Sequence, residues 1–129
     1  MDSFPEFIRN PVNRIATDSQ HTSGVEGYLF DGADGSQVAV WTHPSSVSVL
    51  KSEEHVHDYD EYMVVVQGKY TVIMGRKRVA LAVGEEYLIP RGTPHKGEAT
   101  GGTRTIHAFG GRRAERARKR RSPLPAKRA

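Results

Sequence analysis

Hydrophobic and polar positions alternate in short runs through the middle of the chain. Between residues 25 and 109, β-branched and aromatic residues gather in runs of about four to seven, each bounded by Gly, Pro or Asp. No run has the length or the period of a long amphipathic helix. We therefore predict an all-β fold, an antiparallel sandwich or a small barrel. The predicted strands are residues 26–30, 37–42, 62–66, 70–74, 78–82, 87–89 and 103–109, with a loop over residues 43–54.

Two of the predicted strands are apolar on both faces. Residues 63–66 read Met-Val-Val-Val, and residues 70–74 are nearly as apolar. A sheet with one face in water alternates instead, so we expect the second face to be covered by the N-terminal segment or by a second subunit. Because two-fold homodimers are the commonest oligomers, we predict a homodimer. The N-terminal segment offers Phe4, Phe7, Ile8, Val12 and Ile15.

The composition fits one folded domain of 129 residues. Hydrophobic residues make up 36% and charged residues 26%, which is enough for a modest core and too apolar for a disordered chain. The chain has no cysteine, which excludes a disulfide framework, a thiolate zinc site, an iron–sulfur cluster and a cysteine nucleophile. A bound metal would therefore be held by nitrogen and oxygen.

The net charge of +4 is unevenly placed along the chain. Residues 112–129 hold nine basic side chains and one acidic one, whereas residues 1–111 hold ten basic and fourteen acidic ones. Blocks of like charge repel each other and stay solvated, so we predict a disordered basic tail. No helix-turn-helix motif or aromatic stacking platform accompanies the tail, so nucleic acid is not expected as a partner.

We expect no targeting or membrane-spanning segment in this sequence. Residues 1–8 lack the basic and apolar regions of a secretory leader. The longest apolar runs, residues 63–66 and 79–83, fall far short of the roughly 20 residues that span a bilayer. We expect a cytoplasmic protein without a membrane partner.

Three histidines and one glutamate have the spacing of a metal site. His55 and His57 are separated by one residue, so on a strand both imidazoles would point to one face. Glu61 follows four residues later, and His95 comes after the turn at residues 90–94, which can aim its ring into the same interior. A histidine pair in a sheet, taken alone, is more often solvated or hydrogen-bonded. Three imidazoles and a carboxylate together suit one divalent iron, manganese, nickel, cobalt, copper or zinc ion.

At these positions the sequence resembles the cupin superfamily. The first cupin motif runs Gly-x5-His-x-His-x3,4-Glu-x6-Gly, and it is matched by His55, His57, Glu61 and Gly68. The leading glycine falls at Val49, which suggests a different turn into the strand.

The second cupin motif, Gly-x5-Pro-x-Gly-x2-His-x3-Asn, is matched from Gly84 through Pro90 and Gly92 to His95. Its closing asparagine falls at Ala99, so a local hydrogen bond of the loop is in doubt and the metal ligands are not. Fifteen residues separate the two motifs, which is similar to the spacing in small microbial cupins.

The resemblance implies a double-stranded β-helix, the jelly-roll-like barrel of antiparallel strands of a small single-domain cupin. We expect an N-terminal arm over residues 1–24, the barrel over residues 25–111 and the basic tail over residues 112–129. The resemblance also implies that one divalent transition metal ion is held by His55, His57, Glu61 and His95.

The resemblance further implies a metal-dependent enzyme that acts on a small organic molecule. Relatives include dioxygenases, isomerases, lyases and decarboxylases, and oxygen chemistry is favoured by analogy with the breadth of the family. The alternative is a cupin module that binds a sugar or another metabolite without turning it over. We expect Glu61 to be catalytic as well as a ligand, and His107 to act as an acid or base if it faces inward.

A few other residues are weaker candidates. Strand alternation puts His107 and Thr105 opposite Ile106, but the sequence does not say which face is interior. His43 is more often a structural histidine in such a position. Arg91 and Arg104 are considered as ligands for a substrate carboxylate. One of the tyrosines near the motifs, Tyr59, Tyr62, Tyr70 or Tyr87, is expected to reach the pocket.

Overall fold

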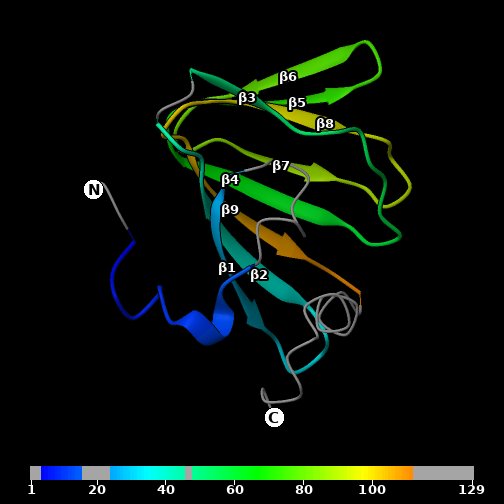
Figure 1. Cartoon of the computed structure of the whole chain (residues 1–129). Coiled ribbons are helices and arrows are strands. Elements are labelled where there is room, and N and C mark those ends of the chain that lie inside the picture. The colour runs from blue at the N-terminus through cyan, green and yellow to red at the C-terminus, as the bar shows by residue number, and fades with distance from the viewer. Residues whose placement is uncertain (1–3, 16–23, 46–47, 112–129) are drawn as a thin grey trace.

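The computed structural model describes residues 4–15, 24–45 and 48–111, and nearly all of its regular structure is β (Figure 1). No helix in these ranges has the length and apolar character needed to cross a bilayer. The elements are the 3-10 helix η1 (Pro11–Asn13) and the strands β1 (Glu26–Asp31), β2 (Gln37–Thr42), β3 (Val49–Lys51), β4 (Glu61–Gln67), β5 (Tyr70–Met74), β6 (Lys77–Leu81), β7 (Glu86–Ile89), β8 (Lys96–Thr100) and β9 (Arg104–Phe109).

Two antiparallel sheets face each other. One has five strands in the order β1-β2-β9-β4-β7, and the other has four in the order β3-β8-β5-β6. Figure 1 shows the four-stranded sheet as one layer and the five-stranded sheet as the layer beneath it. The predicted all-β, jelly-roll-like fold is confirmed. No continuous ladder closes the described strands into a barrel, so the fold is a two-layer sandwich.

The core lies between the sheets because the strands of the five-stranded sheet alternate. Along β4, Glu61, Met63 and Val65 are buried and face inward, whereas Tyr62 and Val66 are exposed on the outer face. Alternation of this kind is the signature of a strand with one covered face. The largest apolar cluster combines inward side chains of both sheets, namely Met63, Val65, Val72, Leu81 and Ile89.

The predicted strands are close to the observed ones, except that β3 and β8 of the four-stranded sheet were not predicted. The expected loop over residues 43–54 contains β3, and β8 falls in a segment for which no strand was predicted. The sequence of β8, Lys-Gly-Glu-Ala-Thr, has low intrinsic β propensity. It is a strand because it lies between β3 and β5 and pairs with both.

The N-terminal segment covers part of the five-stranded sheet on both sides. Phe4 is buried on the outer face, where its ring meets Tyr28 edge-on with centroids 5.8 Å apart. Ile15 is buried on the inner face, where it packs against Leu29, Ala39 and Phe109. Ile8 is half-buried against the cluster that contains Phe4 and Tyr28. Phe7 and Val12 are in solvent, at 81% and 52% exposed. Of the two predicted ways to cover the second face of the sheet, the N-terminal segment therefore accounts for part of the outer face.

Gly68, in the turn between β4 and β5, has two reasons to be glycine. Its φ is +82°, and a Cβ at this position would lie 2.8 Å from the Cα of Thr103, besides clashing with the threonine hydroxyl oxygen. Gly84 has a similar φ of +86° but has no atom within 4 Å of such a Cβ. Of these two glycines, Gly68 alone combines a positive φ with a close approach.

We predict that Gly68→Ala destabilises the fold more than Gly84→Ala does. Both variants strain the backbone, but only Gly68→Ala must also displace the Thr103 backbone, at a further cost of about 1–3 kcal/mol. Urea unfolding of the two variants beside the wild type measures the difference. Equal free energies of unfolding for the two variants would contradict the close approach.

Candidate metal centre

Four side chains converge between the two sheets at one end of the strands. His55 and His57 come from the connection between β3 and β4, Glu61 is the first residue of β4, and His95 directly precedes β8. One ligand atom from each of the four lies within 4.8 Å of the others. The structure thus brings together all four residues that the sequence motifs single out.

The main chain fixes the distance between two of these residues. His55 and His95 form an antiparallel bridge in which each backbone N–H donates to the carbonyl of the other, both at 2.9 Å. This bridge continues the β3–β8 ladder after a one-residue shift, since Lys51 pairs with Glu98. The expectation that His55 and His57 share a strand is wrong, because His57 lies in the loop beyond the bridge. Their rings nevertheless converge, with centroids 4.8 Å apart.

Backbone carbonyls orient two of the imidazoles. The Nδ1 of His55 lies 2.7 Å from the carbonyl oxygen of Glu53, and the Nδ1 of His95 lies 2.8 Å from that of Thr93. A carbonyl only accepts, so in both rings Nδ1 carries the hydrogen and Nε2 is left with its lone pair when the ring is neutral. This is the arrangement that holds metal-ligating histidines in many proteins.

Glu61 is a buried and ionised carboxylate. It is 5% exposed, and burial by itself would raise its pKa. The hydrogen bond from His107 and the nearby rings of His57 and His95 outweigh burial and hold the pKa of Glu61 well below its ordinary value. The pKa of His95 is raised, because its contact with Glu61 and its bond to Thr93 outweigh the opposing effect of burial.

The polar atoms at the centre of the group are arranged for a cation. Oε1 of Glu61 lies 3.2 Å from Nε2 of His57 and 3.4 Å from Nε2 of His95. Yet Glu61 Oε1 and His95 Nε2 are both buried without a well-formed hydrogen bond. Buried polar atoms without a partner are rare and call for an explanation such as a bound ion. Three imidazoles and a carboxylate oxygen fit a divalent transition metal ion.

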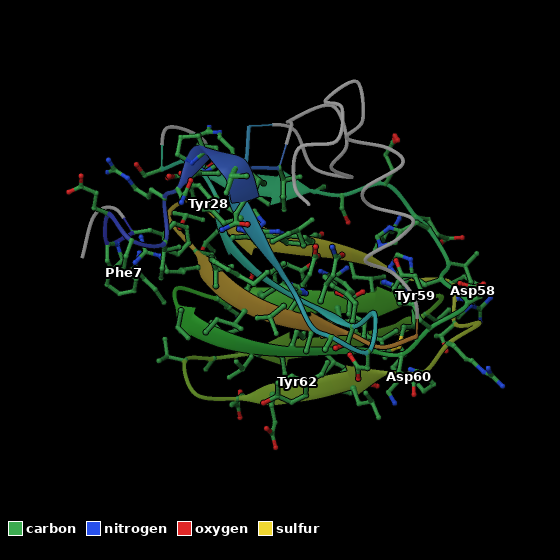
Figure 2. The ribbon with its side chains drawn as sticks, turned by 90° about the horizontal axis from the view of Figure 1, so that it is seen from below. Phe7, Tyr28, Asp58, Tyr59, Asp60 and Tyr62 are labelled. Carbon is green, nitrogen blue, oxygen red and sulfur yellow. The ribbon has the colours of Figure 1, made fainter. Side chains whose placement is uncertain are left out.

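Tyr59 is the tyrosine that lies against this group. Its ring is stacked on His57, with centroids 4.6 Å apart and planes inclined by 10°, and it meets Phe109 edge-on. Figure 2 shows Tyr59 beside Asp58 and Asp60 at the end of the molecule opposite Phe7. Tyr59 is thus half-buried against His57, and the aspartates on either side of it in the sequence are exposed.

His107 of β9 and His43, which directly follows β2, are both buried. His107 is buried and its Nδ1 lies 2.7 Å from Oε2 of Glu61. His43 is buried on the same side of the sheet, 6.1 Å from the ring of Tyr70, and burial lowers its pKa. The pKa of Tyr70 is raised by burial and by the charge of Glu61.

The two candidate arginines are not part of the group. Arg104 lies on the outer side of the sheet, where its guanidinium carbon is 4.3 Å from the centre of the Phe4 ring and its Nε donates to Thr42. Arg91 is exposed, and its backbone N–H donates to Asp60. The basic tail, residues 112–129, lies outside the described residues.

Trp41 is a residue of the site that the sequence did not reveal. Its ring lies 4.3 Å from that of His107, because β2 pairs with β9 and places Trp41 opposite Thr105. The pairing of β2 with β9 joins residues that are 62 to 72 positions apart in the sequence, and no local pattern specifies it.

Comparison with known proteins agrees with this geometry. The family profile Cupin_2, described as "Cupin domain", matches residues 47–109, which include all four converging residues. No curated protein matches the chain in sequence.

Solved structures share the fold at low sequence identity. An RmlC-like cupin from Shewanella frigidimarina superposes with a TM-score of 0.61 at 14% identity, over 84% of this chain and 93% of that one. The Clostridium difficile EutQ protein gives 0.56 at 17% identity, over 80% and 79%. KdgF from Halomonas sp. gives 0.55 at 19% identity, over 74% and 91%. Similarity at this level of identity concerns the fold.

We predict that the variant His55→Ala/His57→Ala loses bound metal, because it removes two of the four donors. Elemental analysis of protein purified without chelators or metal-affinity resin measures the metal content per chain. His43→Ala is the matched control, since it removes a buried histidine outside the group, and it is expected to keep the wild-type content. Unchanged metal in the double variant would overturn the assignment.

Proposed function

Because this chain belongs to the cupin superfamily, we propose that it is a mononuclear metal protein that acts on a small organic molecule. The observation that carries this proposal is the convergence of three imidazoles and one carboxylate. Two atoms of this group, Oε1 of Glu61 and Nε2 of His95, are buried without a hydrogen-bond partner. His55, His57, Glu61 and His95 would hold the ion. When bound, a divalent transition metal supplies Lewis-acid or redox chemistry to a substrate oxygen donor.

The chain's own residues prepare that chemistry. The backbone bonds to Glu53 and Thr93 aim the imidazoles of His55 and His95 at the ion. The apolar cluster around Met63 and Val72 packs between the sheets, where Glu61 and His95 are also buried. Charge interactions at the site are stronger in this low-dielectric interior than they would be in water.

The reaction class that we propose is dioxygenation of the substrate, ahead of isomerisation, lyase chemistry or decarboxylation. The donor set of three imidazoles and one carboxylate supports it, since this set suits iron among other metals. The alternative is a module that binds a metabolite or sugar and leaves it unchanged. The two differ in whether the bound molecule is converted.

We predict that turnover, if assayed with iron, manganese, nickel and zinc forms separately, depends on Glu61. Oxygen uptake and product formation across a panel of small carbonyl, carboxylate and phenolic compounds are the measurements. Glu61→Gln is expected to lower kcat/KM by more than about 100-fold, since loss of even an indirect partner of a ligand costs 10–100-fold. Glu98→Gln, at a half-buried glutamate that is paired with Arg78 and lies outside the group, is the matched control.

One result would count against the enzyme and another against the role of Glu61. Saturable binding without conversion in every metal form would favour the binding module. Full activity in Glu61→Gln would remove Glu61 from the reaction.

We also propose a homodimer formed through the outer face of the five-stranded sheet. The N-terminal segment covers the part of this face near Tyr28, but apolar side chains beyond it remain in solvent. Figure 2 shows Tyr62 on this side, well away from Phe7. A shallow groove there is lined by Val38, Tyr62 and Leu88, among others. The exposed fractions are 54% for Leu88, 42% for Val38, 41% for Val66 and 37% for Tyr62.

We predict a dimer in size-exclusion chromatography with light scattering, at twice the 14.3 kDa of the chain. Leu88→Lys is expected to shift the protein toward monomer, because it places a charge on the apolar outer face, at its most exposed apolar strand residue. Val83→Lys is the control, since Val83 is 60% exposed in the turn after β6. A wild-type protein that elutes only as a monomer would refute the dimer.

A further inference from the structure

The two oxygens of Glu61 have different surroundings. Oε1 faces the Nε2 atoms of His57 and His95, at 3.2 and 3.4 Å, and has no well-formed hydrogen bond. Oε2 points the other way and lies 2.7 Å from Nδ1 of His107. A carboxylate accepts and does not donate, so Nδ1 carries the hydrogen of this bond.

His107 is held rigidly in the position from which it makes this bond. It lies in β9, paired with Met63 of β4 on one side and Ala39 of β2 on the other, and it is 1% exposed. The indole of Trp41 packs against its ring at 4.3 Å, and the ring of Phe109 lies nearly parallel to it at 6.0 Å. The imidazole therefore cannot turn away from Glu61 without disturbing the core.

Thr105 completes the chain of hydrogen bonds. Its Oγ1 lies 2.9 Å from Nε2 of His107, and the residue is fully buried. With the hydrogen of a neutral ring on Nδ1, Nε2 accepts from the threonine hydroxyl. The order from β9 to the centre of the group is Thr105 hydroxyl, His107 imidazole, Glu61 carboxylate, and each contact has one donor and one acceptor.

We propose that His107 is a positioning residue for the metal centre: it occupies Oε2 of Glu61, so that Oε1 alone is offered to the ion. The inference rests on the proposed metal function and adds a residue that lies outside both sequence motifs, 46 positions after Glu61. Without the bond from His107, the carboxylate is free to rotate or to present both oxygens. Partners of this kind orient the ligand and raise metal affinity in other metalloproteins.

The test compares two amide substitutions of similar polarity. In His107→Asn the amide nitrogen takes the place of Nδ1 and still reaches toward Glu61. In His107→Gln the amide takes the place of Nε2 and reaches toward Thr105 instead. Zinc affinity is measured for both variants and the wild type by competition with a chromophoric chelator, and the visible spectrum of each cobalt form is recorded.

The positioning role predicts a difference between the two variants. His107→Gln is expected to bind zinc roughly 10–100-fold more weakly than the wild type, because Oε2 of Glu61 loses its donor. His107→Asn is expected to stay within about 5-fold of the wild type and to keep its cobalt spectrum, by retaining that donor. Thermal unfolding of the metal-free proteins shows whether both variants fold.

Each other outcome gives a definite answer. Equal zinc affinity in Asn, Gln and wild type would overturn the positioning role while leaving the metal centre in place. Equal weakening in both variants, in step with equal loss of thermal stability, would make His107 a purely structural residue and would also overturn it. A wild-type protein that binds neither zinc nor cobalt would instead refute the proposed function itself.

Discussion

The burial of one carboxylate, Glu61, is the constraint on which the rest of this structure depends. Taking an ionised carboxylate out of water costs several kcal/mol unless its oxygens are partnered. His107 partners one carboxylate oxygen of Glu61, Oε2. The other oxygen, Oε1, lies among the Nε2 atoms of His57 and His95. Because those nitrogens are lone-pair donors, the natural completion of the arrangement is a positive ion. The polar group at the centre is therefore compatible with the apolar core around it, because its charge is partnered.

The placement of the donors also joins the two layers of the sandwich. Glu61 belongs to the five-stranded sheet, whereas His95 directly precedes a strand of the four-stranded sheet. An ion held by both is a link between sheets that otherwise meet through side-chain packing. Binding energy at such a link adds to the stability of the folded state, since the unfolded chain does not bring these donors together.

The strands and the four converging residues were predictable, because they are written in local patterns. The apolar run at residues 62–66 located β4, and motif spacing identified His55, His57, Glu61 and His95 as partners. Long-range features were not predictable. The strand β8 depends on its neighbours for its conformation, and the inward direction of His107 depends on which face of β9 the other sheet covers. The outward position of Arg104 and the packing of Trp41 on His107 were not predictable either, because both depend on contacts between residues far apart in the sequence.

The bridge between His55 and His95 is made by main-chain atoms alone. The positions of these two metal donors therefore do not depend on their side-chain chemistry. Peptide groups form the same two hydrogen bonds whichever side chains they carry. The separation of the two positions is thus a property of the backbone, and exchange of an imidazole for a carboxylate there alters donor hardness without moving the anchor points. The fold thus supplies a fixed backbone scaffold for metal donors, and single side-chain substitutions on it can change which metal ion is preferred.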